Sequence, residues 1–353
     1  MKPRLLVIEL HHLGDAVMAI PFLRAASEEF TVGIFCTEAV SAMLKSFVPG
    51  IETFPAREGW TPRILQAATT LRKWRPAVTV SAWSDARVHL VARLSGATRR
   101  IGFPMNPTNY YASQIPWRKR RLDQGSALEN FAQRIGIPLL TDRLQRDDAL
   151  ESHLANWQRI AAALKLNLAL DLPWFDVSSL TPPVELQSFL AEQKHAGRPL
   201  WAVHAGGRLV TKRWPVERFE ALLRDFFAKK NLPVLILGSP GEPIPTPASD
   251  LQRAWSCSSH RELAALLNSA DVVLCNDSYP AHLAAALGRP VFSIFGSGEP
   301  AWFSAYGNRE RVIRKPACPH HPCIDRCVMP SAVCLEAVSV GDVIRFLEQG
   351  GEP

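Results

Sequence analysis

The chain has 353 residues, of which 47% are hydrophobic, and this length and composition suit a globular protein of two domains. It contains no run of about 18 apolar residues and no apparent secretory leader, so we expect a cytoplasmic protein without a transmembrane segment. The net charge is +7, and the whole excess lies in residues 1–150, which hold 20 Lys and Arg against 13 Asp and Glu.

The densest basic runs are Arg99-Arg100 and Arg118-Lys119-Arg120-Arg121. A basic half predicts an anionic partner, although solvated loop charges would give the same composition. No helix-turn-helix, zinc-finger or RNA-recognition pattern accompanies the charge, so we expect no nucleic acid as partner.

The first half alternates strands with helices. It opens with a strand over 4–10, a loop through Asp15 and a helix with apolar residues at helical spacing. Further strands are predicted at about 31–36, 77–82 and 99–103, and helices at about 62–74, 84–95 and 125–135.

The second half repeats this pattern. Its first strand covers 199–204 and is followed by a Gly-containing loop. Later strands are predicted near 232–238, 271–276 and 290–295, and helices near 216–230, 260–268, 279–288 and 340–349. The alternation predicts an α/β protein with one parallel sheet in each half, and residues 173–198, which lack clear periodicity, as the linker.

The most informative segment is 276–296, because it places polar groups where strand ends and a helix start converge. Val272 to Cys275 predicts a buried strand, Ser278 is suited to an N-cap, and Pro280 to an early helical position. The segment between this strand and the following helix therefore carries Asp277, Ser278 and His282. The partial positive charge at the start of a helix favours the binding of a phosphate there.

Two nucleotide-binding signatures are absent from the sequence. No Gly-x-Gly-x-x-Gly follows Leu10, and no Gly-x-x-x-x-Gly-Lys-Ser/Thr occurs. Readings as a dinucleotide oxidoreductase or a P-loop kinase therefore lose their main support.

Four groups of residues resemble glycosyltransferase family 9, the lipopolysaccharide heptosyltransferases. The segment Asn276 to Gly296 with Pro300 is similar to the donor signature of that family. The others are Leu13-Gly14-Asp15, Leu94 to Ala97 leading into Arg100 to Phe103, and Lys212-Arg213-Trp214-Pro215. Together they span residues 5–300, most of the chain.

The resemblance implies a GT-B architecture, in which two Rossmann-like domains with parallel sheets face each other across a cleft. It implies an N-terminal acceptor-binding domain over 1–172, a linker over 173–198 and a donor-binding domain over 199–338. A C-terminal helix over 339–353 would return to the first domain.

The implied function is an inverting, metal-independent transfer of heptose from ADP-heptose to a lipopolysaccharide core acceptor. The partners would be that nucleotide sugar and an anionic glycolipid at the inner face of the inner membrane. Two alternatives stay open: a family member with another nucleotide sugar, and a non-catalytic binding or assembly protein on the same scaffold.

For the donor, the resemblance implies contacts by the residues that match its motifs. Lys212 would bind the phosphates and Glu242 the ribose. Each has a simpler reading: Lys212 and Glu242 as exposed loop charges, Asp277 as a helix cap and His282 as a packing residue. Tyr279 departs from the family, which usually has Gly there. The implied donor set is Lys212, Glu242, Asp277, Ser278, His282 and Gly296.

Asp15 is the implied catalytic base, with an N-cap role as the simpler reading. The chain departs from the family before it, because His11 and His12 stand where a Ser-Ser pair is usual, with Glu9 in place of Arg. Either histidine could therefore take over the proton transfer. The implied acceptor-binding residues are His11, His12, Gly14, Arg100 and Arg120.

Seven cysteines complete the inventory. Cys36, Cys257 and Cys275 lie in or near apolar strands or turns, which predicts buried thiols. Four others form C-x4-C-x3-C-x6-C, a cluster that binds metal more often than it forms disulfides in a cytosolic protein. We expect no cofactor for catalysis and a structural zinc on Cys318, Cys323, Cys327 and Cys334, with unbound thiols or a redox-labile pair as alternatives.

Overall fold

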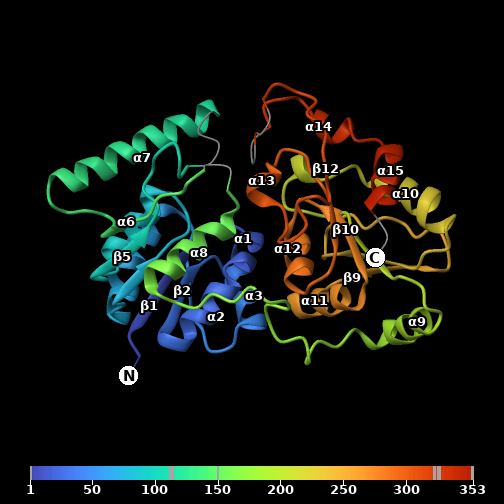
Figure 1. The fold of residues 1–353 in the computed structure, drawn as a ribbon, viewed down its shortest axis with the longest axis horizontal. Helices are drawn as coiled ribbons and strands as arrows, with labels where there is room; N and C mark the ends of the chain where they lie inside the picture. Colours follow the sequence, from blue (N-terminus) through green and yellow to red (C-terminus); the bar gives the residue numbers. More distant parts are fainter. Residues whose placement is uncertain (1, 111–114, 149–150, 321–322, 324–326, 351–353) are drawn as a thin grey trace. The chain divides into compact units, whose positions relative to one another are not determined.

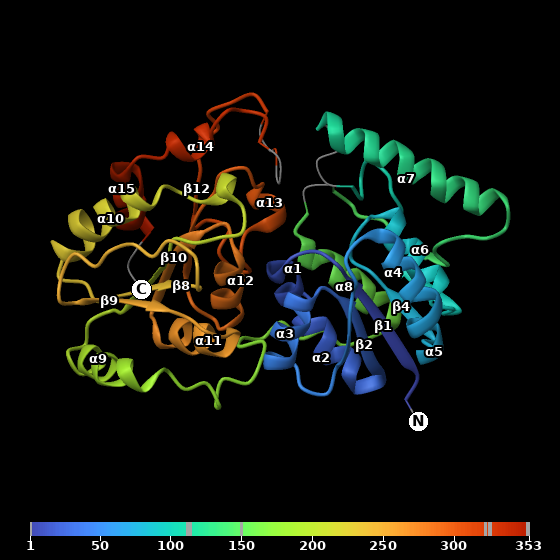
Figure 2. The same ribbon diagram turned by 180° about the vertical axis from the view of Figure 1, so that it is seen from behind.

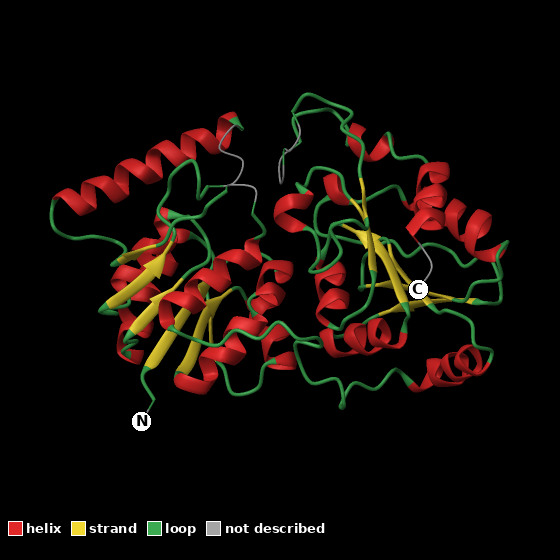
Figure 3. Ribbon diagram, in the orientation of Figure 1, coloured by secondary structure: helices red, strands yellow, loops and turns green. Residues whose placement is uncertain are grey.

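The computed structural model describes residues 2–110, 115–148, 151–320, 323 and 327–350. The chain forms two compact units, Met1–Leu170 and Asp171–Pro353, each built on its own six-stranded sheet (Figures 1 and 3). Every strand pairing in both sheets is parallel, which confirms the α/β class predicted from the sequence. Among the described residues, no helix combines the length and apolar character that crossing a bilayer requires.

The sheet of the first unit has the strand order β3-β2-β1-β4-β5-β6. Leu6 and Ile8 pack with Leu71 and Val88, and the helical segments α4, η1 and α6 contact one another there (Figure 2). The central strands β1 and β2 are nearly continuous apolar runs, as expected for strands buried on both faces. The elements are β1 (Arg4–Glu9), α1 (Leu13–Met18), α2 (Ile20–Glu29), β2 (Thr31–Cys36), α3 (Glu38–Phe47), β3 (Glu52–Pro55), α4 (Trp60–Gln66), η1 (Ala67–Leu71), α5 (Arg72–Trp74), β4 (Val78–Val80), α6 (Ala86–Leu94), β5 (Arg99–Gly102), α7 (Pro116–Arg134), β6 (Asp142–Arg143) and α8 (His153–Leu164).

The sheet of the second unit has the order β12-β11-β10-β7-β8-β9. Read from its other edge, this is the same order as in the first unit, so the chain repeats one topology. The elements are α9 (Val184–His195), β7 (Trp201–His204), η2 (Val210–Lys212), α10 (Val216–Leu222), η3 (Leu223–Ala228), β8 (Val234–Gly238), β9 (Gln252–Ser256), α11 (His260–Ser269), β10 (Val272–Asn276), α12 (Tyr279–Ala286), β11 (Val291–Ile294), α13 (Pro300–Phe303), β12 (Val312–Ile313), α14 (Val333–Glu336) and α15 (Val340–Gly350).

Two sequence expectations need correction. The first helix begins at Leu13, so Asp15 lies inside it and not in a preceding loop. Helix α7 begins at Pro116 instead of about 125, because its polar N-terminal half carries no apolar periodicity to reveal it. Helix α15 buries Val343 and Leu347 in the core of the second unit and contacts α10. The return of this helix to the first domain stays a prediction.

Candidate active site

In each sheet the strand order reverses between two neighbouring strands, β1 and β4 in the first unit and β7 and β10 in the second. Ligands of open α/β sheets bind outside the carboxyl ends of the strands at such a switch point. The register places Cys275 of β10 beside His204 of β7, and Asn276 beside Ile294 of β11. Three strands of the second sheet therefore end at one edge, next to the start of α12.

A buried ion pair lies at this edge. Lys212 Nζ is 2.9 Å from Asp277 Oδ2, and the exposed fractions of the two side chains are 17% and 4%. Asp277 directly follows β10, and its N–H donates to Ile294 O at 3.1 Å. The pair brings a cation and a carboxylate, 65 positions apart in sequence, to the N-terminal end of α12, where the helix dipole favours an anion.

Asn276 holds the segment that carries Lys212. This fully buried side chain donates from Nδ2 to Ala205 O at 2.7 Å and to Gly206 O at 3.1 Å, and its Oδ1 accepts from Trp214 N at 3.0 Å. It therefore ties the end of β10 to the loop after β7 across the switch point. We infer that Asn276 positions the lysine, although the sequence analysis gave it no role of its own.

Glu242 links two further loops of the same edge. Its carboxylate accepts from Gly207 N at 2.9 Å and from Ser239 N at 3.0 Å, and Oε2 lies 3.5 Å from His204 Nε2. The interaction with His204 leads the effects that lower the pKa of Glu242 to about 2. Glu242 is thus ionised and held in place, and Oε1 keeps a lone pair beyond its bond to Gly207 for a ligand hydroxyl.

Ser278 and His282 occupy the start of α12. Ser278 is the N-cap residue, and its hydroxyl donates to Asn276 O at 3.2 Å instead of capping the helix. His282 is buried, and burial lowers its pKa to about 4 despite the nearby carboxylate of Asp277. Its Nδ1 has no hydrogen-bond partner among the described residues. A neutral imidazole with an unused nitrogen therefore lies beside the ion pair.

The buried neutral state of His282 predicts a pH-dependent stability. The pKa of His282 is about 4 in the folded chain, against 6.5 for an ordinary histidine, so the unfolded chain binds more protons as the pH falls below 6.5 and stability is lost. Between about pH 7.5 and pH 5, the free energy of unfolding should fall by about 2 kcal/mol more in the parent than in His282→Asn. Urea unfolding of both proteins at several pH values measures this difference. Parallel pH profiles would contradict it.

Two glycines after β11 allow the backbone of this loop to lie close to Asp277 and to the segment that carries Lys212. A Cβ atom on Gly298 would lie 2.2 Å from Asp277 Oδ2, and one on Gly296 would lie 2.6 Å from Thr211 O. Gly296 was predicted to contribute to the donor site, and Gly298 was not. The run Gly296-Ser297-Gly298 directly after a strand is the sequence signal that could have identified it.

In the first unit, Asp15 is the third residue of α1 and is 5% exposed. Its carboxylate accepts from the N–H of His12 at 3.3 Å, the arrangement in which an acid of the first turn reaches back to the N-cap residue. Asp15 thus supports the start of α1. Gly14 precedes it in the same turn.

A second carboxylate lies at the end of β1. Glu9 is fully buried, and it accepts from the N–H of His11 at 3.0 Å and from the indole N–H of Trp83 at 3.2 Å. The His11 ring stacks on Trp83, with centroids 4.0 Å apart, and its Nδ1 lies 3.4 Å from Glu9. That nitrogen is buried, although 23% of the His11 side chain is exposed. Sequence reasoning missed Glu9 and Trp83, since their pairing depends on the switch point.

The two arginines predicted to bind the acceptor have different environments. Arg100 is 7% exposed and donates to the carbonyls of Ala97 at 2.8 Å, Leu139 at 2.9 Å and Pro138 at 3.0 Å. It therefore holds the chain near residue 139 against β5, and these contacts do not favour a role in acceptor binding, which stays a prediction. Arg120 is exposed on α7.

The four clustered cysteines are all free thiols. Cys323 and Cys334 are buried, and Cys318 and Cys327 are half-buried. Burial leads the effects that raise the pKa of Cys323 to about 12, and the three other thiols contribute. Within the described parts of the chain, no three His, Cys, Asp or Glu side chains gather closely enough to hold a metal ion.

Three solved structures of low sequence identity share the fold. The E. coli ADP-heptose lps heptosyltransferase II has a TM-score of 0.62 and 19% identity over 99% of this chain and 98% of its own. E. coli heptosyltransferase WaaC with ADP-2-deoxy-2-fluoro heptose has a TM-score of 0.64 and 15% identity, over 99% and 100%. The iron-containing dodecameric glycosyltransferase TibC of enterotoxigenic E. coli has a TM-score of 0.51 and 14% identity, over 99% and 76%.

The two parallel sheets and these neighbours define a GT-B fold, as the sequence analysis predicted. The family model for glycosyltransferase family 9 (heptosyltransferase) matches residues 126–332, more than half of the chain. The chain therefore belongs to glycosyltransferase family 9 and is a glycosyltransferase. No curated protein matches it by sequence.

Proposed function

We propose that the chain transfers heptose from ADP-heptose to a lipopolysaccharide core acceptor, with inversion and without a catalytic metal. The observation that carries the proposal is the buried Lys212–Asp277 pair at the start of α12. Solved structures of the same fold are described as a heptosyltransferase with ADP and with ADP-2-deoxy-2-fluoro heptose, which supports the choice of donor.

The donor is assigned to the second unit. Lys212 would neutralise the diphosphate as it leaves, and the N–H groups at the start of α12 would add hydrogen bonds. Glu242 would hold ribose hydroxyls, because an ionised carboxylate accepts from them. Ser278 and His282 would complete the phosphate and sugar contacts, and Gly296 would allow the close approach. A lysine and a helix start supply the positive charge for which other transferases use a metal ion.

The acceptor is assigned to the first unit. An acceptor hydroxyl would attack the anomeric carbon on the face opposite the diphosphate, a bond to the acceptor oxygen would form, and the bond to the phosphate oxygen would break. Asp15 would take the hydroxyl proton as general base, and ADP would leave. Gly14, His11, His12 and Arg120 would contact the acceptor. The excess positive charge of residues 1–150 suits an anionic glycolipid at the inner face of the inner membrane.

A thermal-shift panel of ADP-, GDP- and UDP-sugars tests the donor. A ligand that binds only the folded protein raises the melting temperature by mass action. Selective stabilisation by ADP-heptose is expected. Stabilisation by a different nucleotide sugar would favour another donor. The absence of any shift would favour a non-catalytic binding or assembly protein, for which Tyr279 at the usual Gly position is the supporting observation.

The cysteine cluster is predicted to bind one structural zinc. Four thiolates can complete a tetrahedral shell, and metal binding would displace the thiol protons. Elemental analysis of protein purified without chelator should give about one zinc per chain. Less than about a tenth of an equivalent of any metal would rule the site out, and a full equivalent of iron would replace zinc as the metal.

A further inference from the structure

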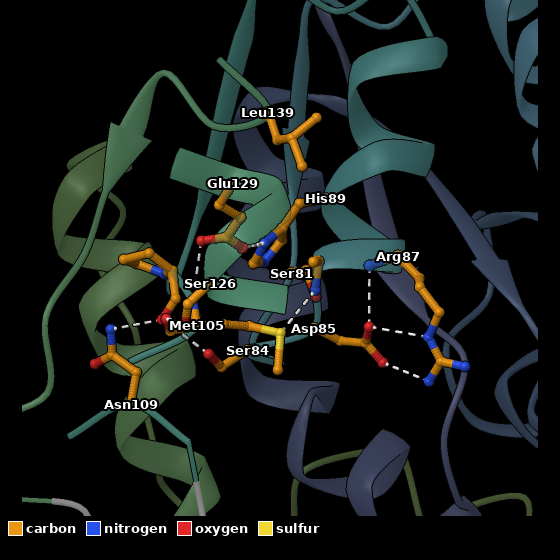
Figure 4. A network of polar contacts seen from close by, with 12 residues as sticks. Ser81, Ser84, Asp85, Arg87, His89, Met105, Asn109, Ser126, Glu129 and Leu139 are labelled. Atoms are coloured by element: carbon orange, nitrogen blue, oxygen red, sulfur yellow. Dashed lines mark hydrogen bonds and ion pairs between the residues drawn. The ribbon is translucent and has the colours of Figure 1, made fainter. Parts of the chain in front are cut away.

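The buried residues among the described side chains of α7 lie on one side of the helix, which packs on the first unit. Glu129 is buried, lies 2.6 Å from His89 Nδ1 and accepts from the N–H of Met105 at 3.0 Å (Figure 4). One turn earlier, Gly125 leaves room for Met105, whose sulfur would lie 1.9 Å from a Cβ atom there. Arg121 pairs with Asp85 at the start of α6. These contacts set the rotation of α7 about its axis, and so decide which residues point away from the unit.

The outward side of α7 and the turn after it carry an unusual concentration of apolar side chains. Nine large hydrophobic residues are exposed in the described part of the chain, and four of them lie within residues 128–137. Leu128, Phe131 and Ile135 recur at the spacing of one helix face. We call the four residues the apolar patch: Leu128, Phe131, Ile135 and Ile137, with exposed fractions of 42%, 60%, 52% and 46%.

Positive charge accompanies the apolar patch. Lys119 and Arg120 are exposed in the N-terminal half of α7, and Arg134 is exposed within the patch itself. Among the described side chains of the helix, Asp123 is the one exposed acid, since Glu129 is buried. The exposed charge of α7 is therefore mainly positive.

We propose that the outward side of α7 docks the enzyme on an anionic lipid bilayer. Apolar side chains on a basic helix enter the boundary between head groups and acyl chains, while Lys and Arg contact the lipid phosphates. A second copy of the chain fits less well, because a symmetric contact through this face would bring the same positive charges together. The docking is inferred from α7 alone. Only its role, which is to bring the enzyme to a lipid-linked acceptor, rests on the proposed function.

Vesicle sedimentation without any sugar nucleotide tests the docking. The full chain should bind phosphatidylcholine vesicles that contain phosphatidylglycerol, and should bind more weakly to pure phosphatidylcholine or at high salt. Phe131→Ser/Ile135→Ser should lower the affinity for anionic vesicles at least about tenfold. Lys119→Gln/Arg134→Gln should lower it by about 25-fold, since each of the two cations contributes about fivefold in affinity near such a surface.

Matched variants remove the same groups elsewhere in the first unit. Leu65→Ser deletes another exposed apolar residue, 59% exposed on α4, and Lys45→Gln/Lys73→Gln deletes two other exposed cations. Both should leave vesicle binding unchanged. Equal losses in the controls and the α7 variants would overturn the proposal, as would unchanged binding in Phe131→Ser/Ile135→Ser.

Two further measurements separate this inference from its rivals. A dimer of the parent that Phe131→Ser/Ile135→Ser dissociates in sedimentation velocity would assign the patch to a second copy and overturn the membrane proposal. Transfer to a delipidated, soluble acceptor should be equal in the parent and in this variant. If the parent binds vesicles but transfers no heptose, the docking stands and the proposed function fails.

Discussion

Replacing Asp15 with Asn should lower turnover by about 10²–10⁴-fold, the usual contribution of a positioned general base. The substitution keeps the shape of the side chain and an oxygen that can accept from the N–H of His12, so the start of α1 should survive. Single-turnover transfer at saturating donor measures the chemical step without product release. Because the donor is assigned to the second unit, ADP affinity should be nearly unchanged.

The effect of Asp15→Asn is best compared with that of a change at His11, which pairs with Glu9 nearby. The His11 side chain is 23% exposed and Asp15 is 5% exposed. Either group could accept the proton of the acceptor hydroxyl. His11→Gln and Asp15→Asn should therefore be measured together. Transfer by Asp15→Asn within a factor of about three of the parent, with a large loss in His11→Gln, would move the base to His11 and make Glu9 its positioning residue.

Lys212→Ala should weaken donor binding about 10- to 100-fold, because it removes a charge-assisted contact of about 1.5–3 kcal/mol to the phosphates. Isothermal titration with ADP measures this loss. Lys229→Ala is the matched control, since Lys229 is an exposed lysine of the same unit that pairs with Asp225. Its ADP affinity should equal that of the parent.

The substitution of Lys212 also removes the ion-pair partner of the buried Asp277 carboxylate. The uncompensated carboxylate would itself repel a phosphate. The double variant Lys212→Met/Asp277→Asn removes both charges and separates the two effects. If the lysine contacts the phosphates, binding stays weak in the double variant. If affinity returns to that of the parent, the single variant acted through the stranded carboxylate, and the phosphate assignment of Lys212 is wrong.

Local pattern alone determined much of the second sheet. The limits of β10 and α12 were predicted within two residues of those observed. The prediction used the buried run before Asn276, the N-cap position of Ser278 and the early Pro280. These features are encoded in neighbouring residues, through burial on both strand faces and the fixed φ of proline. The order of the family motifs along the chain likewise identified the family and the GT-B class.

Other expectations failed where local pattern is weak. The helix around Asp15 begins two residues before it, because His12 is the N-cap residue and Asp15 reaches back from the first turn to its N–H. The polar first half of α7 has no apolar periodicity, and the short strands β3 and β9 were not predicted at all. Edge-side strands and polar helices depend on tertiary contacts more than on their own residues.

The sequence by itself determined the residue types of the site and the strand ends on which they lie. Only the tertiary structure decided which of them meet: the pairing of Lys212 with Asp277, the two glycines beside them, and the burial of Glu9 under Trp83. It also decided that Arg100 is enclosed by backbone carbonyls and that Phe131 points outward. The physical reason is that parallel strands far apart in sequence end at one edge, so these contacts follow from strand order and not from local spacing.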